Sequence, residues 1–213
     1  MAQTLVYVLD NKIYINLTNR CTNKCIFCLR QDKSDVCGQE MWLDSEDFTA
    51  KDVIEQLCNY IGKPSIPPHP YTSEITFCGY GEPTLKFDIL KEVAKFIKDN
   101  YLETKIRLNT NGHANYIFKR NIVPELKGLI DVISVSLNGA NALEYDELSQ
   151  PNFKGAYDEV KKFIKACVGE GIETVATVVE GYKGRHLDLK KCEKIVTDLG
   201  AKFRIREWIE SGY

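Results

Sequence analysis

Short runs of alternating apolar and polar residues and longer stretches with helical spacing follow one another along the chain. Near the start, residues 5–8 and 13–17 alternate in hydrophobicity around Asp10 and Asn11, which predicts a β-hairpin with a tight turn. After this hairpin, runs rich in β-branched residues alternate about six times with segments whose apolar residues recur at helical spacing. This order predicts an α/β fold in which parallel strands are joined by right-handed crossovers.

The same pattern gives approximate bounds for each element. Beyond the hairpin, strands are expected at residues 74–78, 105–110, 129–137, 174–179 and 202–206. Helices are expected at residues 45–60, 85–97, 116–123, 160–169 and 187–199, with Ser45 or Asp44 capping the first, Thr84 capping the second and Gly200 following the last. Residues 29–43 are expected to form a polar loop, and residues 62–73, rich in proline, an extended connection. No break in composition interrupts the pattern, so we expect a single domain over residues 1–213.

Composition and charge narrow the classes of partner. Hydrophobic residues make up 44% of the chain and charged residues 27%, and the net charge is −2, so nothing announces a nucleic acid or an anionic membrane as a partner. The N-terminus lacks a signal-peptide pattern, and no apolar run approaches the roughly 20 residues that span a bilayer. We therefore expect a soluble, cytoplasmic protein whose eight cysteines serve as metal ligands and core thiols.

Three closely spaced cysteines are the clearest chemical signal. Cys21, Cys25 and Cys28 directly follow the second strand of the hairpin, in a C-x₃-C-x₂-C spacing. Thiolates this close together can all reach one soft metal centre, either an iron–sulfur cluster or zinc. A cluster of four irons requires four ligands, so three cysteines leave one iron able to bind another molecule. A structural zinc site with Cys37 as its fourth ligand is the rival interpretation, and the spacing does not exclude it.

Other polar loops also follow predicted strands, at residues 79–84, 109–113, 136–141, 180–186 and 206–210. Because the carboxyl ends of parallel strands lie at one end of a barrel, we expect these loops to gather near the cysteines. His113 and His186 fall in this set. Each is interpreted either as an ordinary polar loop residue or as a contact to a ligand.

With these residues in view, the chain resembles the radical S-adenosylmethionine (SAM) superfamily. The cysteine motif, with the aromatic Phe27 before its third cysteine, looks like the signature of that family. The Gly-Tyr-Gly-Glu-Pro run at residues 79–83 looks like its glycine-rich loop, in a GxGEP form. A narrower resemblance is to small radical SAM proteins associated with TatD-type metallohydrolases, which residues 203–207 also fit.

The resemblance implies a six-stranded partial (β/α)6 barrel, a 4Fe–4S cluster and bound SAM. Cys21, Cys25 and Cys28 would hold three irons, and the amino and carboxylate groups of SAM would chelate the fourth. An electron then breaks a carbon–sulfur bond of SAM, and the resulting 5′-deoxyadenosyl radical abstracts hydrogen from a substrate. The chain is therefore expected to be a radical SAM enzyme, served by a low-potential electron donor such as a flavodoxin or a ferredoxin.

The resemblance also assigns cofactor contacts by position. These are Phe27, Cys78, Gly79, Tyr80, Gly81, Glu82, Asn109, Thr110, Asn111, Ser136, Asn138 and Arg206. Glu82 is either an orienting group or a solvated carboxylate at a helix start, and Asn111 also suits a plain turn. Arg206 lies on the same face of the last strand as Arg204, so it needs solvent or an anion, and the SAM carboxylate or an acidic substrate is the hypothesised partner.

Two non-catalytic interpretations compete with the enzyme. One is a metal-binding module built around a four-cysteine zinc site, and the other is an iron–sulfur electron carrier. A carrier would normally fill all four cluster positions with protein ligands, and it needs no loop for SAM. Within the enzyme hypothesis the substrate stays open, because the sequence fits a small molecule, a protein loop or a nucleic acid equally.

Overall fold

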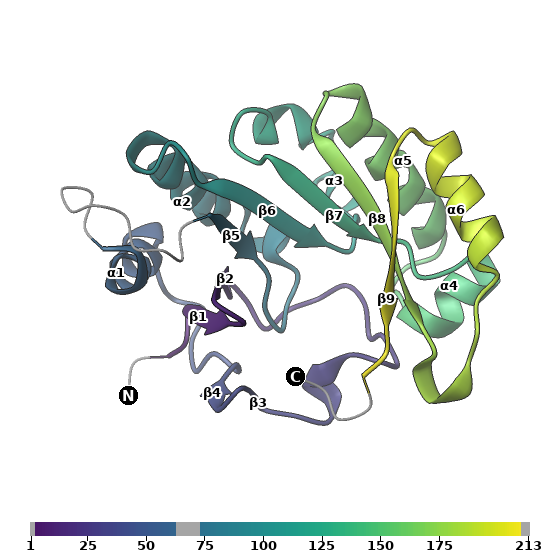
Figure 1. Ribbon diagram of the computed structural model, residues 1–213, viewed down its shortest axis with the longest axis horizontal. Helices are drawn as coiled ribbons and strands as arrows, with labels where there is room; N and C mark the ends of the chain where they lie inside the picture. The colour runs from purple at the N-terminus through teal and green to yellow at the C-terminus, as the bar shows by residue number, and fades with distance from the viewer. Residues whose placement is uncertain (1–2, 63–72, 210–213) are drawn as a thin grey trace. The chain divides into compact units, whose positions relative to one another are not determined.

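The computed structural model describes residues 3–62 and 73–209 (Figure 1). Contacts divide the chain into two compact units. The first comprises Met1–Cys21, Lys33–Asn109 and Gly128–Asp131, and the second comprises Thr22–Asp32, Thr110–Lys127 and Val132–Tyr213. The expected connection at residues 62–73 lies almost wholly outside the described residues. The expectation of a single domain stays a prediction.

The main sheet of the first unit begins with the predicted hairpin. Its strands, in order across the sheet, are β1 (Val6–Leu9), β2 (Lys12–Ile15), β5 (Glu74–Phe77) and β6 (Lys105–Thr110). β1 and β2 are antiparallel, whereas β2, β5 and β6 run parallel. The tight turn is confirmed, because Asp10 and Asn11 have φ angles of 50° and 59°, as a two-residue hairpin turn requires. Helices α1 (Ala50–Ile61) and α2 (Phe87–Asn100) each bury an apolar face.

The starts of two predicted helices in this unit are corrected. α1 begins at Ala50 and not near Ser45, because Thr49 and Asp52 form a capping box. The next helical segment opens with a 3₁₀ turn, η2 (Pro83–Lys86), and α2 follows it at Phe87. Its cap is Glu82 and not Thr84, since the Glu82 carboxylate accepts a hydrogen bond from the Thr84 N–H at 3.2 Å.

Residues 29–43 are not the plain polar loop that was expected. They begin with the 3₁₀ turn η1 (Leu29–Gln31), which belongs to the second unit. A small hairpin then follows in the first unit, formed by β3 (Asp35–Val36) and β4 (Gln39–Glu40). Val36 and Met41 are buried in a hydrophobic cluster with Tyr7 and Tyr80. The hairpin is therefore anchored to the core of the first unit.

The second unit contains the remaining parallel strands, β7 (Val132–Ser136), β8 (Glu173–Glu180) and β9 (Lys202–Glu207), in this order. Helices α5 (Ala156–Gly169) and α6 (Leu189–Asp198) lie along these strands and cover them from one side (Figure 1). A 3₁₀ turn, η4 (Tyr182–Gly184), follows β8. These three strands and the helices α5 and α6 match the predicted ones to within a few residues.

Two helical segments of the second unit differ from the prediction. The helix expected at residues 116–123 is broken into α3 (Ala114–Phe118) and η3 (Val123–Leu126), because Lys119 adopts a left-handed conformation with φ of 53°. Helix α4 (Ala142–Ser149) was not predicted at all. It is capped by Asn141, whose side chain accepts a hydrogen bond from the Glu144 N–H at 3.0 Å.

The predicted fold class is confirmed. The described part of the chain is an α/β structure with mostly parallel strands and an antiparallel hairpin at its N-terminal side. Across residues 3–62 and 73–209, no helix combines the length and the apolar character needed to cross a membrane.

Candidate functional site

The cysteine loop, residues 22–28, is held by the backbone at the end of α4. The hydrogen bonds run from Lys24 N–H to the carbonyls of Ser149 and Gln150, both at 3.1 Å, and from Ile26 N–H to the carbonyl of Leu148 at 3.0 Å. Asn23 also forms an isolated antiparallel bridge with Pro151. The helix that sequence reasoning missed is therefore the support of the loop that carries two of the three motif cysteines.

All eight cysteines lie in the described part of the chain, and none of them forms a disulfide. Cys21, Cys25 and Cys28 are half-buried, and the Cys28 N–H donates to the Cys25 carbonyl at 3.0 Å, which places these two in one turn. Cys21 belongs to the first unit, whereas Cys25 and Cys28 belong to the second. Within neither unit, over the residues described, do three His, Cys, Asp or Glu side chains gather into a metal-ion site.

The other cysteines differ from the motif in their surroundings. Burial raises the pKa of the Cys167 thiol to about 12, and burial together with nearby carboxylates raises the pKa of Cys192 to about 11. Both are inert core thiols, as predicted, whereas Cys58 is only half-buried. Cys37 is exposed in the turn between β3 and β4. Three half-accessible thiols on one short stretch fit the ligand chemistry of an iron–sulfur cluster.

The glycine loop, residues 79–82, follows β5 and lies against the residues that follow β2. A Cβ atom at Gly79 would sit 2.1 Å from Asn16 Oδ1, and one at Gly81 would sit 2.2 Å from the Thr18 carbonyl oxygen. The Glu82 N–H donates to the Arg20 carbonyl at 2.8 Å. Both glycines are therefore required by the close packing of this loop against residues 16–20.

The polar side chains of the glycine loop form hydrogen bonds with other residues of the protein. The Tyr80 hydroxyl donates to the carbonyls of Lys33 at 2.8 Å and Asp35 at 3.3 Å, which ties the loop to the β3–β4 hairpin. Glu82 is only 4% exposed, and its carboxylate accepts from the Thr84 hydroxyl at 2.7 Å. Glu82 is thus a buried cap and not a solvated carboxylate at a helix start. Tyr7 donates from its hydroxyl to the Cys78 carbonyl at 3.2 Å, so this end of β5 is also fixed.

A buried polar network in the second unit joins the cysteine loop to the residues after β6. Asn111 Nδ2 donates to Thr22 Oγ1 at 2.8 Å, and His113 Nδ1 lies 2.8 Å from the same hydroxyl. The other ring nitrogen of His113 lies 2.8 Å from the hydroxyl of Tyr145 on α4. Asn111 also accepts from the His113 N–H at 3.0 Å, so it performs the turn chemistry expected of it. The network makes these residues supports of the cysteine loop.

His113 is buried to 1% exposure, and this burial lowers its pKa to about 4. In the unfolded chain the pKa of a histidine is about 6.5, so unfolding takes up a proton between these two values. The stability linked to His113 is therefore complete above about pH 6.5 and is lost as the pH falls toward 4, with a total of about 3 kcal/mol. We expect urea unfolding of the cluster-free chain to show this loss.

A comparison of variants isolates that histidine from the other groups that titrate in acid. In His113→Gln, the difference in unfolding free energy from the wild type should shrink between pH 7 and pH 4. A constant difference between wild type and His113→Gln across this range would contradict the prediction.

The remaining expected contacts are placed as follows. Phe27 packs with Ile26 against a hydrophobic cluster of the second unit and meets Tyr182 edge-on at 6.0 Å. Asn138, after β7, is buried, and its Nδ2 lies 3.5 Å from Ser149 Oγ. Ser136 is half-buried and Thr110 is buried, with Thr110 Oγ1 accepting from the Gly112 N–H at 3.1 Å. Arg206 is exposed on β9.

Three of the expected or neighbouring asparagines keep a buried acceptor. The Oδ1 atoms of Asn16, Asn109 and Asn138 have no hydrogen-bond partner among the residues that the structure describes. All three follow or end a parallel strand, β2, β6 and β7 respectively. Buried acceptors of this kind are usually satisfied in native proteins, and an unfilled one indicates a place where water or a ligand group can bind.

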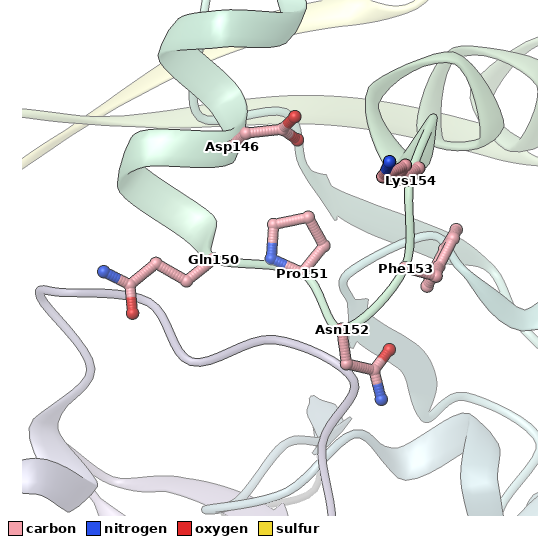
Figure 2. A pocket seen from close by; sticks show the side chains of 6 residues that line it. All are labelled: Asp146, Gln150, Pro151, Asn152, Phe153 and Lys154. Carbon is pink, nitrogen blue, oxygen red and sulfur yellow. The ribbon is translucent and has the colours of Figure 1, made fainter.

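An open surface pocket of about 350 Å³ lies at the connection between α4 and α5 (Figure 2). Its lining consists of Asp146, Gln150, Pro151, Asn152, Phe153 and Lys154. The backbone of this connection also supports the cysteine loop, since the Asn152 N–H donates to the Thr22 carbonyl at 2.9 Å. Phe153 stacks on Tyr116, with ring centroids 4.0 Å apart. The sequence pattern did not single out any of these residues.

The family model and the related proteins that match this chain point to the same family. The model of the family described as "Radical SAM superfamily" matches residues 15–199. The Fe-coproporphyrin III synthase of Methanosarcina barkeri is 30% identical over 74% of this chain, which spans 34% of the synthase. The 7-carboxy-7-deazaguanine synthase of Methanocaldococcus jannaschii is 24% identical over 84% of this chain and 68% of its own length.

Solved structures agree in fold. SuiB from Streptococcus suis, in its complex with S-adenosylmethionine, has a TM-score of 0.60 and 19% sequence identity over 92% of this chain. In its complex with the precursor peptide SuiA, the TM-score is 0.64 over 96% of this chain. The chain spans about two fifths of the length of SuiB, 38% and 41% in the two cases.

Proposed function

Because the chain belongs to the radical SAM superfamily, whose members are enzymes that bind a 4Fe–4S cluster and SAM, we propose that it cleaves SAM reductively and starts radical chemistry on a substrate. One observation carries this proposal. Three half-accessible cysteines begin directly after residues 16–20. The glycine loop packs against these residues so closely that positions 79 and 81 cannot carry a side chain. A zinc module or an electron carrier has no need of such a loop.

Each group of residues has a part in this proposal. Cys21, Cys25 and Cys28 would ligate three irons and leave the fourth to the amino and carboxylate groups of SAM. The chemistry that the bound cofactors supply is the one-electron cleavage of the sulfonium, which leaves a 5′-deoxyadenosyl radical able to abstract hydrogen. The backbone at Cys78, Gly79, Tyr80 and Gly81 would accept hydrogen bonds from the SAM amino group.

The protein's own contribution is to hold these groups in place and to keep the site ordered. The buried cap formed by Glu82 fixes the end of the glycine loop. Phe27, Asn109, Thr110, Asn111, Ser136, Asn138 and Arg206 would surround the rest of SAM. The unfilled acceptors of Asn109 and Asn138 support this, because ribose hydroxyls and the adenine amino group are hydrogen-bond donors.

The known relatives act on substrates of different classes. The related proteins are named for an Fe-coproporphyrin and for a deazaguanine, and SuiB has been solved with a peptide, so they do not converge on one class. The GxGEP form of the glycine loop and residues 203–207 support the narrower assignment to the TatD-associated group. We also propose a cytoplasmic location. The electron donor would be a flavodoxin or a ferredoxin, because the cleavage requires a low-potential electron.

The test is anaerobic reconstitution with iron and sulfide, followed by addition of SAM and dithionite. The wild type should be brown, should bleach on reduction, and should form 5′-deoxyadenosine. A brown protein that forms no product would favour an electron carrier. A colourless protein loaded with zinc would exclude the proposal.

A further inference from the structure

Residues 18–20, the run that leads into Cys21, lie against the glycine loop within the first unit. A Cβ atom at Gly81 would be 2.2 Å from the Thr18 carbonyl oxygen and 2.5 Å from that of Arg20. The Glu82 N–H donates to the Arg20 carbonyl at 2.8 Å. These contacts are with the backbone, so any shift of residues 18–20 must move the glycine loop as well.

Glu46 holds this run through its carboxylate. One oxygen accepts from the Thr18 hydroxyl at 2.5 Å and from the Asn19 N–H at 3.0 Å. The other oxygen pairs with Arg20 Nε at 3.1 Å. A single side chain therefore bonds three consecutive residues, although it lies outside every helix and strand of the first unit.

Lys86, which follows the glycine loop in the chain, also contacts Glu46. Its ammonium group donates to the Glu46 carbonyl at 2.7 Å and lies 3.6 Å from the Glu46 carboxylate. Lys86 is the last residue of η2, which is capped by Glu82. The contacts thus run from Glu46 to residues 18–20, on to Glu82, through η2 to Lys86, and back to Glu46.

The interactions that Glu46 makes differ in strength. The Arg20 side chain is 66% exposed, so its ion pair contributes little. Thr18 is 1% exposed, and a buried hydroxyl bonded to a carboxylate is among the stronger hydrogen bonds. Burial would raise the pKa of Glu46, but the bonds from Thr18 and Asn19 and the nearby cations outweigh it and hold the pKa below its ordinary value. Glu46 is therefore ionised at neutral pH.

We propose that Glu46 is a positioning residue, which fixes the glycine loop relative to Cys21 and so sets the affinity for SAM. The inference rests on the proposed function, because SAM is the molecule that would contact both the cluster and the loop. Glu46 itself would contact neither the cluster nor SAM. It acts through the backbone of residues 18–20.

The first test is amide hydrogen exchange on the whole chain as purified, in Glu46→Ala and Glu46→Gln. Both variants should speed exchange at Asn19, whose N–H donates to Glu46, and also at Glu82, whose N–H donates to the Arg20 carbonyl. The matched control is Glu55→Gln, which removes an exposed ion pair with Lys51 on α1 and should leave both amides unchanged. Faster exchange at Asn19 with unchanged exchange at Glu82 would overturn the coupling.

The second test measures SAM cleavage by reconstituted protein. Glu46→Ala should keep its iron content and raise KM for SAM about tenfold, with kcat changed less than about twofold. Glu46→Gln keeps an acceptor for Thr18 and Asn19 but loses the ionic contacts, so its KM should rise only about threefold.

The outcomes separate the two proposals. A wild type that forms 5′-deoxyadenosine while both variants keep its KM overturns the role of Glu46 alone. A wild type that forms no 5′-deoxyadenosine overturns the proposed function and this inference with it. If Glu46→Ala does not fold, Glu46→Gln decides by the same measurements, and an unchanged KM in that variant overturns the inference.

Discussion

Replacing Cys25 with alanine is expected to abolish 5′-deoxyadenosine formation and to leave reconstituted protein with little bound iron. A three-cysteine cluster site has no spare ligand, so two thiolates cannot hold the same cluster. Replacing Cys37 with serine is expected to leave both iron content and product formation unchanged. Cys37 is exposed in the turn of the β3–β4 hairpin and has a φ of 50°, which suits a turn residue and needs no ligand to explain it.

The pair of variants separates a three-cysteine site from a four-cysteine site. Metal analysis and the visible absorbance of the reconstituted protein provide a readout that does not depend on turnover. If Cys37→Ser loses metal to the same extent as Cys25→Ala, then Cys37 is a fourth ligand and the zinc interpretation gains the advantage. If Cys25→Ala keeps both its iron and its product, the proposed function is wrong.

The elements of this chain that could be predicted from sequence are those whose signal is local. Short runs with β-branched or alternating apolar residues indicated the parallel strands that the structure describes, and Asp10 with Asn11 indicated the hairpin turn. The cysteine spacing and the glycine loop are also local, because a few neighbouring residues carry the chemistry. The bounds of the strands were therefore nearly right, and the two motifs could be recognised before any contact was known.

The parts that could not be predicted depend on contacts between distant residues. Ser45 and Thr49 are both good caps, and α1 begins after Thr49, while Glu46 between them is engaged with Thr18. Helix α4 shows no clear apolar face in the sequence, because one of its buried residues, Ser149, is polar and the apolar Leu143 is exposed. Its buried Tyr145 and Leu148 lie on one side of the helix and contact the cysteine loop and its network. Propensity and periodicity carry no information about such partners.

The candidate site shows the same limit. The sequence pointed to His113 as a polar loop residue or ligand contact, but burial to 1% exposure between Thr22 and Tyr145 makes it a structural support. Glu82 was weighed as an orienting group or a solvated carboxylate, and it is a buried cap. In both cases the residue was found by its position near a motif, while its role follows from neighbours far away in the sequence.

Replacing Gly81 with alanine is expected to raise KM for SAM about a hundredfold while leaving the cluster in place. The added Cβ atom would lie 2.2 Å and 2.5 Å from two backbone carbonyl oxygens, of Thr18 and Arg20. Backbone atoms cannot rotate away as a side chain can, so the glycine loop must move, and overpacking of this kind costs about 1–3 kcal/mol. That free energy corresponds to roughly a fivefold to 150-fold change in affinity, and two backbone contacts below 3 Å place the effect toward its upper end.

Gly169→Ala is the matched control, because a Cβ atom at Gly169 would have nothing within 4 Å. Gly169 is the last residue of α5, where alanine is a better helix former than glycine, so this variant should keep its KM for SAM and gain a fraction of 1 kcal/mol in stability. Iron content, measured in both variants, separates loss of the cluster from loss of SAM binding. A Gly81→Ala protein with full iron content and wild-type KM would mean that the glycine loop does not contact SAM. The added Cβ atom must displace either the glycine loop or residues 18–20, and a shift of residues 18–20 would also move Cys21 and lower the iron content.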